Sequence, residues 1–452
     1  MYHLKQNLSK YVIFIIVFFA LYVDGNLRLW TMKERVIEYD VRTYYGYLPA
    51  TFIYHDLKLE NPDKFKYGEN LYWIWSTPTD NGPIFKMTMG LSYLYLPFFA
   101  SGHLIASLSG YETNGFSEPY KIMLLIGGLV YYFLGLYYVR KLLKQYFNET
   151  IVSIVLVLIG LGTNLLFYST INATMSHVYN FALFAMFIYY TRNWHNNPSL
   201  KNASLIGLLF GLISLIRPSN AAIAIVFVLY NISSTRQLKE RASLFLNNYK
   251  SILLITIISA IIWIPQFLYW KYITGSYLFY SYKDESFFFS NPHIIKGLFS
   301  FQKGWLIYTP IMAFALLGFV FMKGNVKNLR PFLIIFITLM IYITFSWWCW
   351  WYGGTFGQRS MIDFYALLAI PLASFVQYIL SKKLIIKVIF AFLALFFTWL
   401  NVFQSYQFEY LSLHHDAMTK TLYFKQFGKI KKIDNFEKYL VYPDYEKAKK
   451  GE

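Results

Sequence analysis

The sequence contains little charge and almost no cysteine. Only 14% of its 452 residues are charged, whereas soluble proteins carry about 25%. The single cysteine, Cys349, excludes an intramolecular disulfide. In place of charge the chain has 57% hydrophobic and 21% aromatic residues, and apolar runs such as 11–23 and 333–348 recur along its length. This composition excludes an ordinary soluble protein and predicts an all-α polytopic membrane protein.

Acidic residues are also scarce, with 23 Asp and Glu against 41 Lys and Arg. Such an excess can indicate nucleic acid, but the short loops that follow alternate apolar segments carry 15 basic residues against 5 in the opposite loops, as expected for the cytoplasmic side of a membrane. We therefore expect no nucleic-acid partner. The sequence has no Walker loop, GxGxxG, CxxC pair or serine nucleophile elbow. His414 and His415 are adjacent, so they cannot face one ion on a helix. We expect no cofactor, and a divalent metal is not supported.

Eleven segments are apolar enough to be membrane helices. We interpret the first as an uncleaved span, because no small-residue cleavage site follows it. With eleven spans, loop charge places the N-terminus in the cytoplasm of an inner or plasma membrane. The expected spans are about 11–27, 120–139, 150–168, 175–191, 203–216, 219–232, 251–272, 304–322, 331–347, 361–380 and 384–402.

The apolar stretch 87–108, which contains Pro97, leaves two topologies open. If it lies along or dips into the membrane, there are eleven spans, and loop 28–119 and the tail both lie outside. If it crosses, there are twelve spans, and the loop up to residue 86 lies inside. We divide the chain into a transmembrane domain, 1–403, and a short polar tail, 404–452, which we interpret as a cap or a docking segment.

Two expected spans, 203–216 and 219–232, are short. Each has 14 residues, or ~21 Å of helix, against a hydrocarbon core of ~30 Å. Between them Pro218 ends the first helix, and Asn220 is expected to cap the second. Arg217 in this hinge is therefore expected below the outer membrane surface, where an arginine costs roughly 2.5–3.5 kcal/mol. An anionic group should compensate it.

With eleven spans, one face of the protein gathers carboxylates, fixed cations and aromatic rings. That combination suits an anionic lipid headgroup that carries a sugar: cations bind phosphate, aromatic rings pack on sugar faces, and a carboxylate moves a proton. The cations are Lys86, Arg217 and Arg359; possible substrate-binding residues are Glu38, Tyr44, Tyr45, Asp80, His177, Glu285, Trp351 and Gln358; the carboxylate of greatest interest is Asp40.

Each of these residues also has a structural interpretation. Asp40 can cap a helix that starts there. The tyrosines that follow it can form an aromatic belt at the membrane surface. Arg359 can mark a helix end, His177 can be a buried polar residue with satisfied hydrogen bonds, and Glu285 can be solvated.

The order of several motifs is more specific than any one of them. "YDVRTYYGYLPATFIYHD" (39–56) follows the first span, and "GPIFKMTMGLSYLYLPFFASGH" (82–103) follows that. "GLLFGLISLIRPSN" (207–220), "SYKDESFFFSNP" (281–292), "GLFSFQKGWLIYTPI" (297–311) and "WWCWWYGGTFGQRSMIDFYALLAIPL" (347–372) come later. Over roughly residues 1–403 the chain resembles polytopic GT-C glycosyltransferases, the group that includes protein O-mannosyltransferases and lipid A aminoarabinose transferases.

The resemblance implies transfer of a sugar from a polyprenyl-phosphate donor to a glycan, lipid or protein acceptor at the outer face. Asp40 matches the general base in the first outer loop. Val41 stands where many members have a second acidic residue, which argues against a metal-dependent variant. Arg217, Arg359 and Lys86 would stabilise the departing lipid phosphate. A single displacement would invert the anomeric carbon, and a groove between spans would hold the prenyl chain.

Two other classes of protein compete with this interpretation. A secondary transporter or lipid flippase should have ionisable residues near mid-membrane and an internal inverted repeat. A non-catalytic scaffold should tolerate loss of Asp40, Arg217 and Arg359. The clustering of charge at one face and the lack of a repeat favour the glycosyltransferase.

Overall fold

The computed structural model describes residues 2–61, 64–67, 70–71 and 74–452. Seven helical segments in these residues are long and apolar enough to cross a membrane. They are α1 (Tyr2–Leu27) with η1 (Leu29–Thr31), α3 (Gly90–Leu108), α4 (Glu118–Leu143), α10 (Tyr249–Thr274), η5 (Gly324–Leu329) with α14 (Arg330–Ser346), η6 (Arg359–Phe364) with α15 (Tyr365–Leu380), and α16 (Leu384–Glu409). The protein is a helical multi-pass membrane protein, as expected, but seven segments rather than eleven have the full length of a span.

Other apolar segments form shorter helices: α5 (Glu149–Gly160), α7 (Leu200–Ile216), η4 (Pro218–Ile223) with α8 (Ala224–Leu229), and α13 (Ile311–Phe321). The segment expected at 150–168 shows one reason why an expected span forms a shorter helix. α5 ends at Gly160, and the chain continues in turns and η3 (Phe167–Ser169). Asn164 and Ser169 in this stretch are fully buried. Irregular backbone between spans is tolerated here because protein covers it.

The hinge at Arg217 forms where the sequence predicts it. α7 ends at Ile216, and Arg217 is extended, with φ −144° and ψ 104°, as the residue before a proline should be. Pro218 then opens η4. Asn220 does not cap the second helix; its side chain contacts Asp363 instead. Pro218 already removes one of the backbone donors that a cap would satisfy, so the amide of Asn220 is available for that contact.

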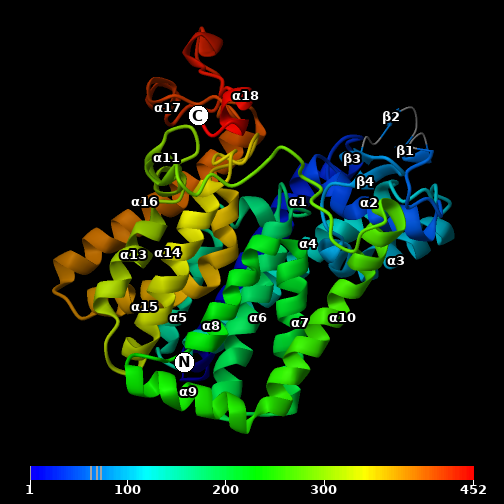
Figure 1. Ribbon diagram of the computed structural model, residues 1–452. Helices are drawn as coiled ribbons and strands as arrows, with labels where there is room; N and C mark the ends of the chain where they lie inside the picture. Colours follow the sequence, from blue (N-terminus) through cyan, green and yellow to red (C-terminus); the bar gives the residue numbers. More distant parts are fainter. Residues whose placement is uncertain (1, 62–63, 68–69, 72–73) are drawn as a thin grey trace.

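The helices form one bundle with different decorations at its two ends (Figure 1). α15 lies in the middle of the bundle. In the most apolar stretch of Arg359–Leu380, 89% of the residues are buried. It packs against α13 and α5, and α6 (Ser176–Asn196) joins it to α4 and α7. α9 (Thr235–Asn247) lies across one end, whereas α11 (Ile294–Phe299), α17 (Lys420–Gln426) and α18 (Tyr445–Lys449) lie at the other. α12 (Trp305–Tyr308) precedes α13.

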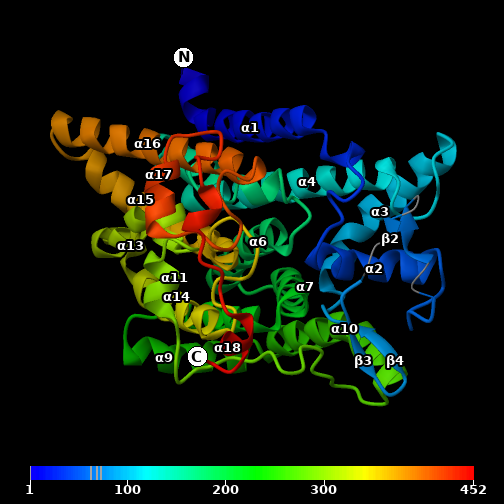
Figure 2. The ribbon, with the colours of Figure 1, turned by 90° about the horizontal axis from the view of Figure 1, so that it is seen from above.

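The first loop folds into a compact unit beside the bundle, where α2 (Asp40–Phe52) and α3 lie side by side (Figures 1 and 2). Two antiparallel hairpins follow α2. They pair β1 (Lys66–Tyr67) with β2 (Asn70–Leu71), and β3 (Ser76–Thr79) with β4 (Gly82–Phe85) in the register Ser76↔Phe85 to Thr79↔Gly82. Tyr44, Tyr45 and Tyr47 are at most 6% exposed. These rings face protein, so they do not form an aromatic belt at the membrane surface.

The polar contacts of Lys121 bear on the two topologies. Lys121, in the first turn of α4, donates hydrogen bonds to the carbonyls of Met32 and Lys33, 2.8 and 2.9 Å away, just after α1. The end of α1 and the start of α4 therefore lie at one face. In the described part of loop 28–119, α3 alone has the length of a span, and a single crossing by α3 would put those two ends on opposite faces. This geometry supports the arrangement in which 87–108 does not cross.

The tail is folded against the end of the bundle rather than extended. α16 continues to Glu409, beyond the expected boundary at residue 403, and α17, η7 (Phe436–Tyr439) and α18 follow it. Leu422, Phe436 and Ala448 are buried. His415 O accepts hydrogen bonds from Thr355 N, at 3.2 Å, and from the buried ammonium of Lys303. The tail is therefore attached to the loop that carries Arg359.

Candidate functional site

Asp40 and Arg359 meet where the first loop contacts the bundle. α2 begins at Asp40, but the N-cap position is Tyr39, and no side chain caps the helix. The capping interpretation of Asp40 is therefore wrong. Its carboxylate instead reaches η6, where Arg359 Nη2 lies 2.9 Å from Asp40 Oδ2. Both side chains are 16% exposed. A carboxylate in the first turn of a helix is also favoured by the helix dipole.

The anionic group that compensates Arg217 is Asp363, which is fully buried on η6. Asp363 Oδ2 lies 3.4 Å from Arg217 Nη1 and accepts hydrogen bonds from Asn180 and Asn220, at 2.9 and 2.8 Å. Asp363 Oδ1 lies 3.0 Å from His177 Nδ1. Both oxygens of this carboxylate thus face a donor or a cation, which is the condition for burying it.

Sequence reasoning missed Asp363. It stands in "SMIDFYALL", inside an expected span, and an ionisable residue in such a place is a functional hypothesis by default. Its position inside an expected span could have identified Asp363 as a candidate functional residue. His177 is buried, faces Asp363 and packs edge-to-face on Tyr168 with ring centroids 5.4 Å apart. The structural interpretation of His177 as a satisfied polar residue agrees with these contacts.

Tyr44 lies one helical turn after Asp40, close to both arginines. Burial raises the pKa of Tyr44 to about 12, and the charge of Asp40 adds to the effect. The phenol therefore stays neutral and can donate a hydrogen bond at physiological pH. Arg217 also donates to Ser360 Oγ at 3.2 Å and lies 5.8 Å from the ring centroid of Tyr352.

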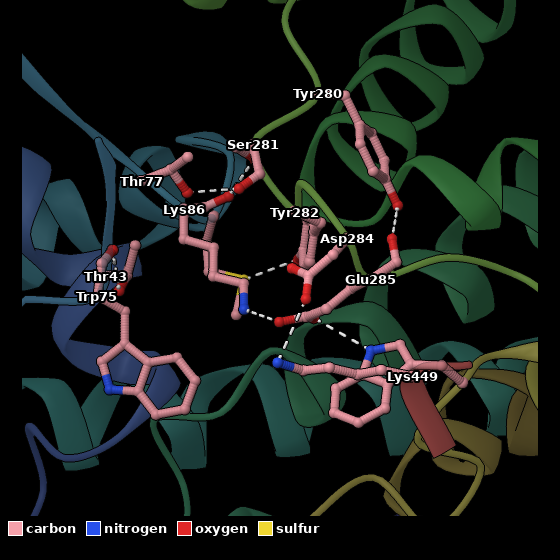
Figure 3. A network of polar contacts seen from close by, with 12 residues as sticks. Thr43, Trp75, Thr77, Lys86, Tyr280, Ser281, Tyr282, Asp284, Glu285 and Lys449 are labelled. Atoms are coloured by element: carbon pink, nitrogen blue, oxygen red, sulfur yellow. Dashed lines mark hydrogen bonds and ion pairs between the residues drawn. The ribbon is translucent and has the colours of Figure 1, made fainter. Parts of the chain in front are cut away.

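Lys86 and Glu285 form a third charged pair (Figure 3). Lys86 Nζ lies 5.3 Å from the ring centroid of Trp75 and 5.2 Å from that of Tyr282. Trp348 donates to the other carboxylate oxygen of Glu285 at 3.2 Å. Glu285 is 16% exposed, so the interpretation of this residue as solvated is wrong. The charge of Lys86 is neutralised by Glu285 in this arrangement.

Most of the other residues predicted for the site contact neighbouring segments of the protein, and one lies at the surface. The hydroxyl of Tyr45 donates to Gly115 O, Trp351 packs on Tyr445 with centroids 5.3 Å apart, and Gln358 Nε2 donates to Trp350 O at 2.9 Å. Glu38 lies 3.6 Å from Arg35, and Asp80 is exposed in the turn between β3 and β4. Within the described residues, no group of three or more His, Cys, Asp or Glu side chains is arranged to hold a metal ion.

An apolar groove of about 460 Å³ lies between α2, α3 and α10. Its lining includes Tyr47, Phe52, Met89, Leu96 and Leu268. Asp40, Tyr44, Tyr47 and Thr51 share one face of α2, because they are spaced by three or four residues. That face therefore leads from the Asp40–Arg359 pair to the groove. A second cavity of about 350 Å³ shares Thr51, Leu57 and Tyr272 and carries the charged Asp56, Lys58 and Glu60.

Neither protein-family models nor curated protein sequences match the chain. Solved structures do. The crystal structure of the apo oligosaccharyltransferase of Archaeoglobus fulgidus matches with a TM-score of 0.52 and 13% identity, over 98% of this chain and 60% of that one. A complex of the oligosaccharyltransferase AglB from the same organism with an inhibitory peptide and a dolichol-phosphate has a TM-score of 0.47 and the same identity and coverage. The first match shows that the chain has the GT-C fold, as the resemblance implied. The chain spans about 60% of the length of these neighbours.

Proposed function

We propose that the protein is a GT-C glycosyltransferase that moves a sugar from a polyprenyl-phosphate donor to a glycan, lipid or protein acceptor. The observation that carries the proposal is the pairing of Asp40 with Arg359 beside Arg217, on a fold shared with an oligosaccharyltransferase. A carboxylate is the usual proton acceptor of such a reaction, and guanidinium groups match the geometry of a phosphate.

The reaction is a single displacement. Asp40 takes the proton of the acceptor nucleophile, which attacks the anomeric carbon as the bond from that carbon to the phosphate oxygen breaks. The bonding electrons leave with the lipid phosphate, and the configuration of the anomeric carbon inverts. Arg359 has one ion-pair partner, Asp40, among the described residues, so its other N–H groups can bind the departing phosphate.

Arg217 supplies the second cation. Asp363 holds it in place but lies 3.4 Å from Nη1 and leaves part of the guanidinium free. Lys86 can join the phosphate only if Glu285 releases it, and Glu285 would then keep its contact with Trp348. We place the prenyl chain in the groove between α2, α3 and α10, because the face of α2 that begins with Asp40 also carries Tyr47 and Thr51, which line that groove.

The location of the site follows from the same contacts. Arg35 Nη1 and Nη2 lie 2.7 and 2.9 Å from the carboxylate of Glu409, at the end of α16. Loop 28–39, the candidate site and the tail therefore belong to one face. We propose that this is the outer face of the plasma membrane, because the basic short loops lie at the other end of the bundle.

The test uses the purified full-length protein in nanodiscs and a panel of polyprenyl-phosphate hexoses and pentoses. Extracted cell-envelope glycans, lipids and proteins serve as acceptors, and mass spectrometry follows release of polyprenyl phosphate. We expect release with one donor class, reduced about 10²–10⁴-fold in Asp40→Asn. Asp284→Asn is the control, because Asp284 is 69% exposed and pairs with Lys449 on the surface.

Wild-type rates in Asp40→Asn would remove Asp40 from the mechanism. No release with any donor, together with movement of the labelled lipid between leaflets, would favour the flippase instead.

A further inference from the structure

The tail carries a basic turn that the proposed reaction does not use. We define the basic turn as residues 424–432, "FKQFGKIKK", which contain four lysines and no acidic residue. Phe424, Phe427 and Ile430 are 59%, 39% and 52% exposed. Lysines and exposed apolar side chains therefore alternate on one short segment. An exposed apolar side chain is unfavourable in water, and this pattern is typical of segments that lie on a membrane surface.

Hydrogen bonds from two buried glutamines fix the backbone of the basic turn. Gln426 is 1% exposed, and its amide donates to Lys429 O and Lys431 O at 2.9 and 2.8 Å, while its Oε1 accepts from Ile433 N at 3.2 Å. Gln407 of α16 donates to Gln426 O and Lys429 O at 3.1 and 2.7 Å. Two buried glutamines thus fix the backbone. Because the carbonyls of Lys429 and Lys431 bond inward, the turn keeps one shape while its side chains remain exposed.

The contact with Gln407 also sets the depth of the turn. Gln407 lies in the last turn of α16, a helix long and apolar enough to cross the membrane. Trp399, Tyr406 and Tyr410 near that end are 46%, 42% and 54% exposed, as expected for side chains at the boundary between lipid and water. A turn that is hydrogen-bonded to this helix end lies at the same boundary, next to the headgroups.

The charges favour anionic headgroups. Lys425 lies over the ring of Tyr439, and Lys432 pairs with Glu437 at 3.2 Å. Lys429 and Lys431 are exposed and have no ion-pair or ring partner among the described residues. We propose that the basic turn is a binding site for anionic phospholipid headgroups of the leaflet in which α16 ends, with Ile430 and Phe427 inserted between lipids. A soluble polyanion would pair with the lysines but leave those apolar side chains in water.

This binding would have a consequence for the tail as a whole. Before the turn, His415 contacts the Arg359 loop, and after it Ala448 of α18 packs in the tryptophan cluster Trp348–Trp351. Anionic lipid at the basic turn would hold the middle of the tail on the membrane, while His415 before the turn and α18 after it hold the tail on the bundle. The inference does not depend on the reaction that we propose for Asp40.

The test places a fluorophore on Ile430→Cys in a Cys349→Ala background. Burial raises the pKa of Cys349 to about 12, so that thiol reacts slowly, and its replacement removes the remaining label. One full-length copy per nanodisc excludes contacts between copies. The nanodiscs contain phosphatidylcholine with increasing phosphatidylglycerol, and either lipid can be brominated. We expect brominated phosphatidylglycerol to quench the label more strongly than brominated phosphatidylcholine.

Lys429→Gln with Lys431→Gln should raise the half-saturating phosphatidylglycerol content roughly 30-fold, because each lysine contributes about 1 kcal/mol near an anionic surface. Lys447→Gln in α18 with Lys450→Gln just after it, an equal loss of charge, should leave the half-saturating content unchanged. Equal quenching by both lipids that survives the double substitution would overturn the charge recognition. No quenching by either lipid would place the turn in water, and a response to soluble dextran sulfate alone would assign it to a polyanion instead.

Discussion

At the scale of single residues, Asp363 makes the placement of Arg217 possible. Asp363→Asn keeps the shape but removes the charge that compensates a largely buried guanidinium. Removing one partner of a buried pair costs about 3–5 kcal/mol, because the other charge is left without compensation. We expect a loss of that size in the free energy of unfolding, measured by denaturant titration in detergent.

The control for Asp363→Asn is its combination with Arg217→Gln. The double variant should lose less stability than the sum of the two single variants, since neither charge is then left alone. Additive losses would show that the two groups do not interact energetically, whatever their distance. Asp284→Asn removes a carboxylate from an exposed pair and should not change stability measurably.

Glu38 provides a dependence on pH. Burial raises the pKa of Glu38 to about 7 from its ordinary value of 4.5, and Arg35 only partly opposes the effect. Between these values the folded protein holds a proton that the unfolded chain has released. Stability is therefore full below pH 4.5 and falls as pH rises to 7, by up to about 1.4 kcal/mol per unit. In Glu38→Gln this slope should be absent when the free energy of unfolding is plotted against pH. Identical slopes in the wild type and the variant would show that Glu38 titrates normally.

The sequence identifies the charged residues of the site better than their partners. Asp40, Arg217 and Arg359 are conspicuous because each stands at the edge of an apolar segment. Their pairings join positions 40 with 359 and 217 with 363, and no local pattern encodes contacts over such separations. Asp363 was missed because averaging hydropathy over "SMIDFYALL" hides a single carboxylate among apolar neighbours.

At the scale of elements, the start of α3 fixes the position of the arginine hinge. A Cβ on Gly90 would lie 2.6 Å from Ile216 N and 2.7 Å from Leu215 C, both backbone atoms that cannot move aside. Gly90→Ala should therefore push α3 away from α7, cost about 1–3 kcal/mol, and displace Arg217. Sugar transfer should fall by more than this loss of stability explains, as measured at a temperature where both proteins are fully folded.

Gly25→Ala is the matched control, because no atom of the described residues lies within 4 Å of the methyl group that it adds to α1. Alanine in a helix is more favourable than glycine by roughly 0.5–1 kcal/mol, so this variant should be as stable as the wild type or slightly more so. Equal behaviour of Gly90→Ala and Gly25→Ala would remove the argument that close approach of α3 positions the hinge.

The sequence predicts where apolar helices occur more reliably than it predicts where each helix ends. The runs expected as spans are helical over most of their length, since burial in lipid or protein rewards apolar sequence in either case. Their ends differ where polar contacts decide the backbone. α5 stops at Gly160 because Asn164 is drawn into a hydrogen bond with Tyr365, at 2.7 Å, on the central helix. The β3–β4 hairpin and the fold of the tail depend on contacts with distant segments and could not be predicted from local sequence.

At the scale of the whole molecule, polar contacts join the first loop to an early and to a late membrane helix. Lys121 joins it to α4, and Arg35 joins it to the end of α16. The tail then reaches back to the Arg359 loop and, through Lys449 and Asp284, 3.4 Å apart, to the loop that carries Glu285 (Figure 3). Segments from four parts of the sequence therefore close over one face, and the opposite end carries α9.

This arrangement predicts which positions are accessible from outside the cell. In a Cys349→Ala background, Asn81→Cys in the β3–β4 turn and Lys438→Cys in η7 should both react with a membrane-impermeant maleimide in intact cells, since both positions are exposed. The side chain of Arg236 on α9 is 89% exposed. Arg236→Cys should nevertheless react only after permeabilisation, because the basic loops around it belong to the cytoplasmic side. Labelling of Lys438→Cys but not Asn81→Cys in intact cells would place the hairpin and the tail on opposite faces. Asp40 could not then serve Arg359 as the general base of a composite site, and the proposed reaction would lose its geometry.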